Sequence, residues 1–330
     1  MSDTATFSTW LKSDGKFLAS DDTPRLLQPG DILDGWRVIS FIARGGNAEV
    51  YRAEHTELKT IAAIKISIAD TSESHARFKQ EAQILGGVHH EALPVFHAFG
   101  EKSGHAYIIT EFLQPLELPR TDRAVAQFAT QIANALDALH ANDIVHRDVK
   151  PGNIMTRNGQ DPVLVDLGYA KRLATSTAQQ QSISIEQSRL VGLGTPGYAA
   201  PEQFTGEEIT PASDIHALGV LLNECFDGKP PRQWKRIIAK CTSSLPDYRF
   251  HTAQEFIRAV RHRNLQRMLF WTLCGILALG LTAAFAIIPA IIRQREQAKA
   301  EEAERQRQEE NVRRAQESIM REIQLIMDEK

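Results

Sequence analysis

The sequence predicts an α+β fold in two lobes, a small β-rich lobe followed by a helical one, and then one transmembrane helix. Three observations lead to this prediction. Short apolar runs with strand alternation come first, helical periodicity dominates from Thr121 onward, and residues 268–292 carry no charge. With 330 residues, 42% of them hydrophobic, the chain can build a sizeable core.

The N-terminal segment, residues 1–30, is predicted to be a flexible leader. It is rich in Ser, Thr and Asp and ends in the turn-forming pair Pro29-Gly30. It has no basic start followed by an apolar core, so it does not read as a secretory signal.

The first lobe is expected over residues 31–113. Its strands are WRVISFIA, EVYRAEH and IAAIKISI, with turns at Gly45-Gly46 and around Thr56; a helix in HARFKQEAQIL and the strands VFHAFGE and AYIITEF follow. Helices then dominate, which predicts a helical lobe over residues 114–262.

Residues 268–292 are the predicted transmembrane helix. These 25 residues are flanked by Arg267 and Arg293, and as a helix they would measure about 37 Å, against about 30 Å of hydrocarbon. A buried core helix is the alternative, but such helices seldom run so long without an outward-facing polar residue. Residues 293–330 form a charged, helix-favouring tail. Its Val312, Ile319 and Ile326 recur every seven residues over about two heptads, so a solvated helix and a pairing helix both remain open.

Composition excludes several classes of function. The formal net charge is −3 with both signs interspersed, which gives no overall attraction for nucleic acid. Cys225, Cys241 and Cys274 are too few and too scattered for a disulfide framework or a metal cluster. The part of the chain before residue 268 is therefore expected in a reducing cytoplasm.

The strongest signal is IVHRDVKPGN at residues 144–153, followed by VLVDLG at residues 163–168. Phosphoryl transfer needs a carboxylate for the attacking hydroxyl, a cation for the moving phosphoryl group and oxygen ligands for magnesium. Asp148 suits the first role and Lys150 the second, while Asn153 and Asp166 would hold the metal. Surface polar residues in loops are the alternative, but several matching segments would then have to coincide.

These segments resemble the eukaryotic-type protein kinase family, in particular its bacterial membrane-anchored serine/threonine members. The resemblance covers residues 36–262 and implies a two-lobed protein kinase fold that uses ATP with Mg²⁺, Mn²⁺ being an alternative. It also implies that Lys65, in AAIK, grips the nucleotide phosphates and that Glu81, in RFKQEAQIL, positions it.

The glycine-rich loop departs from the family pattern. ARGGNAEV places Ala43, Gly45 and Ala48 at the three glycine positions, and the two methyl groups would hold the backbone slightly farther from the phosphates. Val50 and Ala63 are expected to roof the adenine, Glu111 and Leu113 to offer hinge backbone groups, and Thr110 to be the gatekeeper. The predicted nucleotide site therefore comprises Ile42, Ala43, Gly45, Gly46, Ala48, Val50, Ala63, Lys65, Glu81, Glu111 and Leu113.

Downstream, GTPGYAAPEQF at residues 194–204 resembles the substrate-receiving segment of protein kinases. The resemblance implies that Glu202 pairs with Arg249, that Asp214 caps the catalytic-loop backbone, and that Lys150 with Thr195 favours Ser or Thr acceptors. Between Leu222 and Trp234, NECFDGKPPRQ replaces the longer stretch that usually carries a substrate-docking helix, which leaves the mode of protein docking open.

Three hypotheses follow. The leading one is an active membrane-anchored Ser/Thr kinase, with its catalytic domain in the cytoplasm, its tail on the opposite side, and protein substrates as partners. The alternatives are a pseudokinase scaffold, supported by the altered glycine loop, and a receptor whose main function lies beyond the membrane.

The kinase is expected to phosphorylate its own activation loop, because the cation of Arg147, which is expected to be buried beside Asp148, needs an anionic partner. Pairing of two chains into a homodimer could assist this reaction. The stretch from Lys171 to Thr195 contains the hydroxyl side chains of Thr175, Ser176, Thr177, Ser182, Ser184, Ser188 and Thr195. Of these, Thr195 is expected to shape the receiving site rather than to accept phosphate.

Overall fold

A computed structural model describes residues 24–173 and 194–328 of the chain. The chain divides into two compact units, Met1–Arg263 and Asn264–Lys330, and each is described by itself. Most of the predicted leader, the predicted phosphorylation sites from Thr175 to Ser188, and the last two residues of the tail lie outside the described residues.

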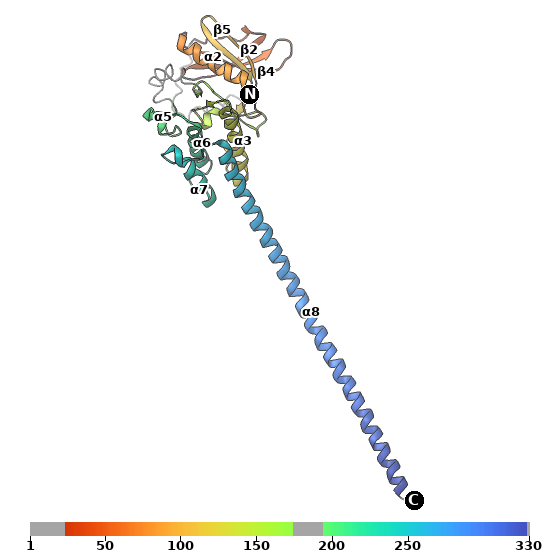
Figure 1. The fold of residues 1–330 in the computed structure, drawn as a ribbon. Helices are drawn as coiled ribbons and strands as arrows, with labels where there is room; N and C mark the ends of the chain where they lie inside the picture. The colour runs from red at the N-terminus through yellow and green to blue at the C-terminus, as the bar shows by residue number, and fades with distance from the viewer. Residues whose placement is uncertain (1–23, 174–193, 329–330) are drawn as a thin grey trace. The chain divides into compact units, whose positions relative to one another are not determined.

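The first part of unit 1 is a six-stranded antiparallel sheet in the order β1-β2-β3-β4-β6-β5 (Figure 1). Its strands are β1 (Ile32–Leu33), β2 (Trp36–Arg44), β3 (Ala48–His55), β4 (Ile61–Ser67), β5 (Phe96–Lys102) and β6 (His105–Glu111). Helix α2 (Ser72–Gly87) packs against β4, β5 and β6, and its N-cap Thr71 accepts a hydrogen bond from Ser74 N. The predicted strands and helix of this lobe are confirmed.

The second part of unit 1 is helical. It contains α3 (Asp122–His140), α5 (Glu202–Thr205), α6 (Pro211–Cys225), α7 (Arg232–Cys241) and the first residues of α8 (Ala253–Asp328). Short strands pair beside α3: β7 (Gln114–Pro115), β9 (Ile154–Thr156) and β10 (Pro162–Leu164) form one small sheet, and β8 (Ile144–Val145) pairs with β11 (Lys171–Arg172). Strands followed by helices make the α+β two-lobed fold that the sequence predicts.

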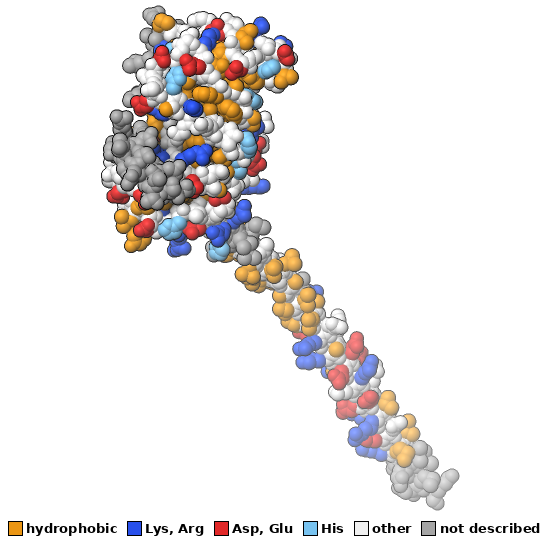
Figure 2. Space-filling model, turned by 45° about the horizontal axis from the view of Figure 1, so that its top comes forward, with side chains coloured by type: hydrophobic (Ala, Val, Ile, Leu, Met, Phe, Trp, Pro, Cys, Tyr) orange, Lys and Arg blue, Asp and Glu red, His pale blue; other side chains and the backbone are white. Residues whose placement is uncertain are grey.

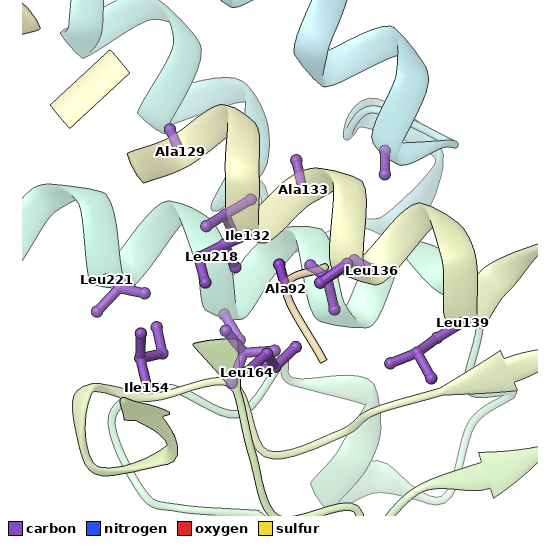
Figure 3. Packing of buried hydrophobic residues seen from close by; sticks show 14 of the residues in the cluster. Ala92, Ala129, Ile132, Ala133, Leu136, Leu139, Ile154, Leu164, Leu218 and Leu221 are labelled. Atoms are coloured by element: carbon purple, nitrogen blue, oxygen red, sulfur yellow. The ribbon is translucent and has the colours of Figure 1, made fainter. Parts of the chain in front are cut away.

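The core of the helical lobe is a continuous cluster of buried aliphatic side chains. Figure 3 shows Ile132 and Leu136 of α3 pointing toward Leu218 of α6 and Leu164 of β10. Ala92, from the segment between α2 and β5, joins the same cluster, and its carbonyl accepts a hydrogen bond from Leu164 N at 2.9 Å. This segment therefore ties the sheet lobe to the strand that precedes the DLG sequence.

The segment from Phe226 to Pro231 joins α6 to α7 and contains no helix. The shortening of the docking region that the sequence predicts is thus present in the fold. Trp234, at the start of α7, is fully buried and packs on Phe226 with a ring-centroid distance of 5.6 Å. The rest of the lobe closes without the extra helix.

Residues 24–30, the end of the predicted leader, pack onto the sheet. Leu27 is buried, and its N–H donates to Tyr51 Oη at 3.1 Å, while Leu26 N donates to Glu49 Oε2 at 3.0 Å. Tyr51 donates to the same Oε2 of the buried Glu49, and Arg44 Nη1 forms an ion pair with the other oxygen, Oε1, at 3.2 Å. This contact was not predicted from the sequence.

The second unit is the continuation of α8, which is helical to Asp328 and contains Pro289. In the part of the chain that the structure describes, this is the one helix long and apolar enough to cross a membrane. Hydrophobic side chains such as Phe270, Trp271, Leu279 and Phe285 are exposed along it. Figure 2 shows this orange stretch followed by mixed blue and red side chains.

Candidate active site

One face of the sheet carries several of the predicted nucleotide-binding residues. Directly opposite residues in an antiparallel ladder point to the same face, and the register pairs Ala43 with Val50, Val50 with Lys65, and Ala63 with Thr110. Lys65 and Ala63 are two residues apart on β4 and therefore also share a face. The structure thus brings Ala43, Val50, Ala63, Lys65 and Thr110 together, while Ile42 lies next to the irregularity in β2.

The glycine-rich turn joins β2 to β3. Gly45 N donates to Ala48 O at 2.8 Å, which closes the turn, and Gly45 and Gly46 are both exposed. Ala48 is buried against the core, so its methyl group points inward. Asn47, at the tip, donates from Nδ2 to Tyr169 Oη at 3.1 Å, which connects the turn to the segment after the DLG sequence.

The hinge follows β6. Glu111 N donates to Val95 O at 2.9 Å, and Leu113 is buried just after the strand ends. The Glu111 side chain has a partner that the sequence did not reveal, because Arg157 donates to its two oxygens at 2.6 and 2.8 Å. Arg157 also donates to the carbonyl of Glu91 at 2.7 Å. The β9–β10 connection is therefore clamped to the hinge.

Lys65 lies between two carboxylates. Its Nζ donates to Glu81 Oε1 and Oε2 at 3.0 and 2.9 Å and to Asp166 Oδ1 at 2.7 Å. Burial would lower the pKa of Lys65, but the charges of Asp166 and Glu81 outweigh it, so the pKa is raised and the ammonium stays charged. Burial likewise opposes ionisation of Asp166, but Lys65 holds the pKa of Asp166 below its ordinary value.

Asp166 sits in the left-handed region with φ of +66°. Gly168, two residues later, lies close to both carboxylates: a Cβ at this position would be 3.3 Å from Asp166 Oδ1 and 3.4 Å from Glu81 Oε2. Glycine therefore lets the chain pass beside both carboxylates without crowding them.

The catalytic-loop segment connects β8 to β9. Asp214, fully buried near the start of α6, accepts hydrogen bonds from His146 N and Arg147 N, both at 2.8 Å, and its Oδ2 lies 2.8 Å from His140 Nε2. Arg147 has a φ of +71°, a strained conformation for a non-glycine residue. The Asp214 carboxylate holds this turn in place and so aims Asp148, as the resemblance implied.

Asp148 is buried, and both of its carboxylate oxygens have partners. Thr195 Oγ1 donates to Oδ1 at 2.8 Å, whereas Asn153 Nδ2 and Lys150 Nζ approach Oδ2 at 2.8 and 3.1 Å. Lys150 Nζ also donates to Thr195 Oγ1 at 2.8 Å. A hydroxyl therefore already lies where a carboxylate can accept its proton, with an ammonium beside it.

Asn153 and Asp166 offer oxygen atoms that could bind a divalent cation next to Asp148. Val165 N donates to Asn153 O at 2.9 Å, which holds the two predicted ligand segments side by side. The contacts described above engage the amide nitrogen of Asn153 and Oδ1 of Asp166, which leaves the Asn153 amide oxygen and Asp166 Oδ2 as the ligand atoms to consider. Oxygen donors of this kind are the ones that Mg²⁺ prefers, so the residues fit such an ion.

The receiving segment is anchored by two buried groups. Glu202 and Arg249 form a bidentate pair with distances of 2.6 and 2.8 Å, and both side chains are almost fully buried. Gln203, which was not predicted as a site residue, donates from Nε2 to Arg147 O at 2.9 Å and accepts from Ala200 N at 3.1 Å. It joins the receiving segment directly to the catalytic loop.

Comparison with known proteins gives a consistent result. Residues 36–272 match the family model described as protein kinase domain. Serine/threonine-protein kinases PknH and PknD of Mycobacterium tuberculosis are each 33% identical to the chain, over 61% and 64% of its length and over 33% and 32% of their own. A probable serine/threonine-protein kinase PknB of Lactococcus lactis is 30% identical over 62% of the chain and 34% of its own length.

The chain spans about a third of the length of these curated relatives. Among solved structures, the kinase domain of Mycobacterium tuberculosis PknI superposes with a TM-score of 0.55 and 21% identity, covering 72% of this chain and 99% of that domain. This likeness agrees with the two-lobed fold.

Proposed function

The chain belongs to the protein kinase domain family, and we propose that it is an active kinase that transfers the γ-phosphoryl group of ATP to Ser or Thr of proteins. The observation that carries this proposal is the contact of Thr195 Oγ1 with both Asp148 and Lys150. The side chains of Asp148 and Lys150 thus approach the same hydroxyl, which supports a role for them in transfer to the hydroxyl of a Ser or Thr acceptor.

Each residue then has one role. Asp148 orients the acceptor hydroxyl and accepts its proton, and Lys150 stabilises the negative charge of the phosphoryl group in flight. Lys65 binds the α and β phosphates, and Glu81 fixes its position. Asn153 and Asp166 would hold Mg²⁺, with Mn²⁺ as an alternative; when bound, the metal offsets the charge of the phosphates. Ala43, Val50 and Ala63 would line the adenine side, and the backbone of Glu111 and Leu113 would bind its edge.

A pseudokinase scaffold is the alternative, and its support is the alanine at positions 43 and 48 of the glycine-rich turn. Several observations favour activity. Lys65 Nζ already contacts both Glu81 and Asp166 at 2.7 to 3.0 Å, and a Lys–Glu ion pair of this kind is needed in an active kinase. The Ala48 methyl group is buried in the core cluster.

We further propose that residues 268–292 anchor the kinase in a membrane as a single-pass protein. Exposed side chains such as Trp271, Ile276 and Leu281 offer a long apolar surface, and a continuous surface of this kind is unfavourable in water. Because ATP is supplied in the cytoplasm, the catalytic domain is placed there and the charged tail on the opposite side.

Self-phosphorylation within residues 171–195 and pairing of two chains complete the proposal. Arg147 is buried next to Asp148, and burial lowers its pKa while Asp214 opposes that shift. A phosphate on one of residues 171–195 would supply further negative charge if it binds this cation. The heptad positions Val312 and Ile319 are exposed on α8 and are available to a second copy.

The test is to incubate the purified full chain with ATP, Mg²⁺ and a generic acceptor protein, and to map phosphate by mass spectrometry. An active kinase labels Ser or Thr of the acceptor and loses this activity when the metal is chelated. Nucleotide binding without any labelled acceptor or loop residue would instead support the scaffold.

A further inference from the structure

Helix α7, the residue Lys229 before it and the first turns of α8 carry many exposed Lys and Arg side chains. Seven exposed Lys and Arg side chains make up this region, called here the basic surface: Lys229, Arg232, Lys235, Arg236, Lys240, Arg258 and Arg261. Between Lys229 and Lys240 the sequence has no Asp or Glu. The whole chain carries a formal charge of −3, so this concentration of cations is local.

Within the described residues, the side chains of the basic surface form no ion pairs with Asp or Glu. Elsewhere in unit 1, buried or half-buried cations such as Lys65, Arg157 and Arg249 form ion pairs. Among the ion pairs between described residues, none involves a member of the basic surface; Lys240 contacts the ring of Phe250 at 4.3 Å. Their charge is therefore available to an external anionic partner.

The basic surface is fixed to the residue at which unit 1 ends. Asp122 Oδ1 accepts hydrogen bonds from Trp234 Nε1 at 2.7 Å and from Arg263 Nη1 at 2.6 Å. The guanidinium of Arg263 also lies over the Trp234 ring at 4.5 Å, and both side chains are buried. Helix α7 is thus held beside the last residues of unit 1.

The proposed transmembrane segment begins very soon afterwards. Only residues 264–267 separate Arg263 from Met268, a length of about 7.5 Å as a helix and at most about 18 Å if fully extended. Whatever angle this connection adopts, the end of unit 1 that carries Arg263 stays within reach of the lipid headgroups. Figure 1 shows α7 at the end of unit 1 opposite the sheet strands β2 and β5.

We propose that the basic surface binds the anionic lipid headgroups of the membrane that residues 268–292 cross. The proposal rests on the transmembrane anchor proposed above. Phosphate groups of lipids match the exposed Lys and Arg side chains, and clusters of such residues next to a membrane span are attracted to anionic leaflets. Binding would hold α7 against the membrane and restrict the rotation of the kinase lobes about their short connection.

The test uses the full chain in vesicles. A donor dye is attached through Ala239→Cys, an exposed position of α7, in a Cys274→Ser background, because Cys225 and Cys241 are buried. Energy transfer to an acceptor lipid is compared between pure phosphatidylcholine and vesicles in which roughly a third of the lipid is phosphatidylglycerol. Transfer should be higher in the anionic vesicles, and this difference should vanish at about 0.5 M NaCl, because salt screens the attraction.

Two charge-reversed double variants distinguish an effect of the basic surface from an effect of the net charge of the chain. Lys235→Glu with Arg236→Glu should abolish the lipid-dependent difference. Arg37→Glu with Lys59→Glu, which makes the same change of net charge on exposed positions of the sheet lobe, should leave it intact. Equal loss in both pairs would overturn the proposal.

Extraction with alkaline carbonate distinguishes the two proposals. A chain that stays with the vesicles but shows equal transfer in both lipids overturns the basic surface and leaves the anchor standing. A chain that carbonate releases overturns the anchor, and the basic surface with it.

Discussion

The substitution Arg249→Met should strongly destabilise the catalytic domain. Arg249 is fully buried and donates to both oxygens of Glu202 and to the carbonyls of Ser243, Ala212 and Ser244. Removing one partner of a buried ion pair costs about 3–5 kcal/mol, because the remaining charge loses its compensation. For a domain of this size, that loss corresponds to a fall in Tm of about 6–20 °C.

The same pair predicts how the loss depends on pH. Burial would raise the pKa of Glu202, but hydrogen bonds from Arg249 and Ser213 outweigh it and hold the pKa below the ordinary 4.5. A carboxyl group with a depressed folded-state pKa contributes stability above its unfolded pKa and loses it as the pH falls through the folded pKa. In Arg249→Met the charge and hydrogen bonds of Arg249 are lost, and only weaker groups such as the Ser213 hydroxyl still oppose the effect of burial on Glu202. The loss of stability relative to wild type should therefore narrow as the pH falls toward and below about 4.5, because protonation removes the poorly compensated charge of Glu202.

The assay is denaturant unfolding of the full chain in detergent at neutral pH and near pH 4, followed by near-ultraviolet circular dichroism. A double-mutant cycle with Glu202→Gln isolates the pair; the double variant should be more stable than the sum of the single losses predicts. If the free energy of unfolding of Arg249→Met lay within about 1 kcal/mol of the wild-type value at neutral pH, the predicted role of the buried pair would be refuted.

Three further predictions concern function and topology. Lys65→Met should lower kcat/KM for ATP by about 10²-fold or more in steady-state kinetics, since charge-assisted hydrogen bonds to phosphate are lost; unchanged kinetics would contradict its role. Thr195→Val should lower kcat/KM for a protein acceptor roughly tenfold, the worth of about one hydrogen bond, while Thr195→Ser keeps the hydroxyl and serves as the control. Protease added to spheroplasts should clip the tail and spare the catalytic domain, and the reverse pattern would refute the proposed orientation.

Much of the fold was predictable from local patterns. The alternation of apolar and polar residues predicts β2, β3 and β4, and helical spacing predicts α2 and α3. The residues that meet at the candidate site were also found from sequence, because Asp148, Asn153 and Asp166 stand at short, fixed spacings on either side of paired strands. Their roles remain predictions that the kinetic experiments test.

Contacts that depend on chain closure were not predictable. A glutamate is ordinarily exposed, but Glu49 is buried and accepts a hydrogen bond from Leu26 N in the segment that returns to the sheet. Arg157 and Glu111 are 46 residues apart, and Gln203 reaches a backbone carbonyl 56 residues away. The adjacent leucines Leu26 and Leu27 were the one available signal that the end of the leader packs against the sheet.

Phosphate transfer by Asp148→Asn is the measurement that tests the central proposal most directly. The variant and wild type should be prepared together, and transfer to an acceptor protein and nucleotide affinity should be measured on the same samples. The proposal predicts that transfer falls by about 10²–10⁴-fold, the usual worth of a general base, while nucleotide affinity stays close to wild type because Lys65 and Asp166 are untouched. Transfer at the wild-type rate would contradict the assignment of Asp148 as the base.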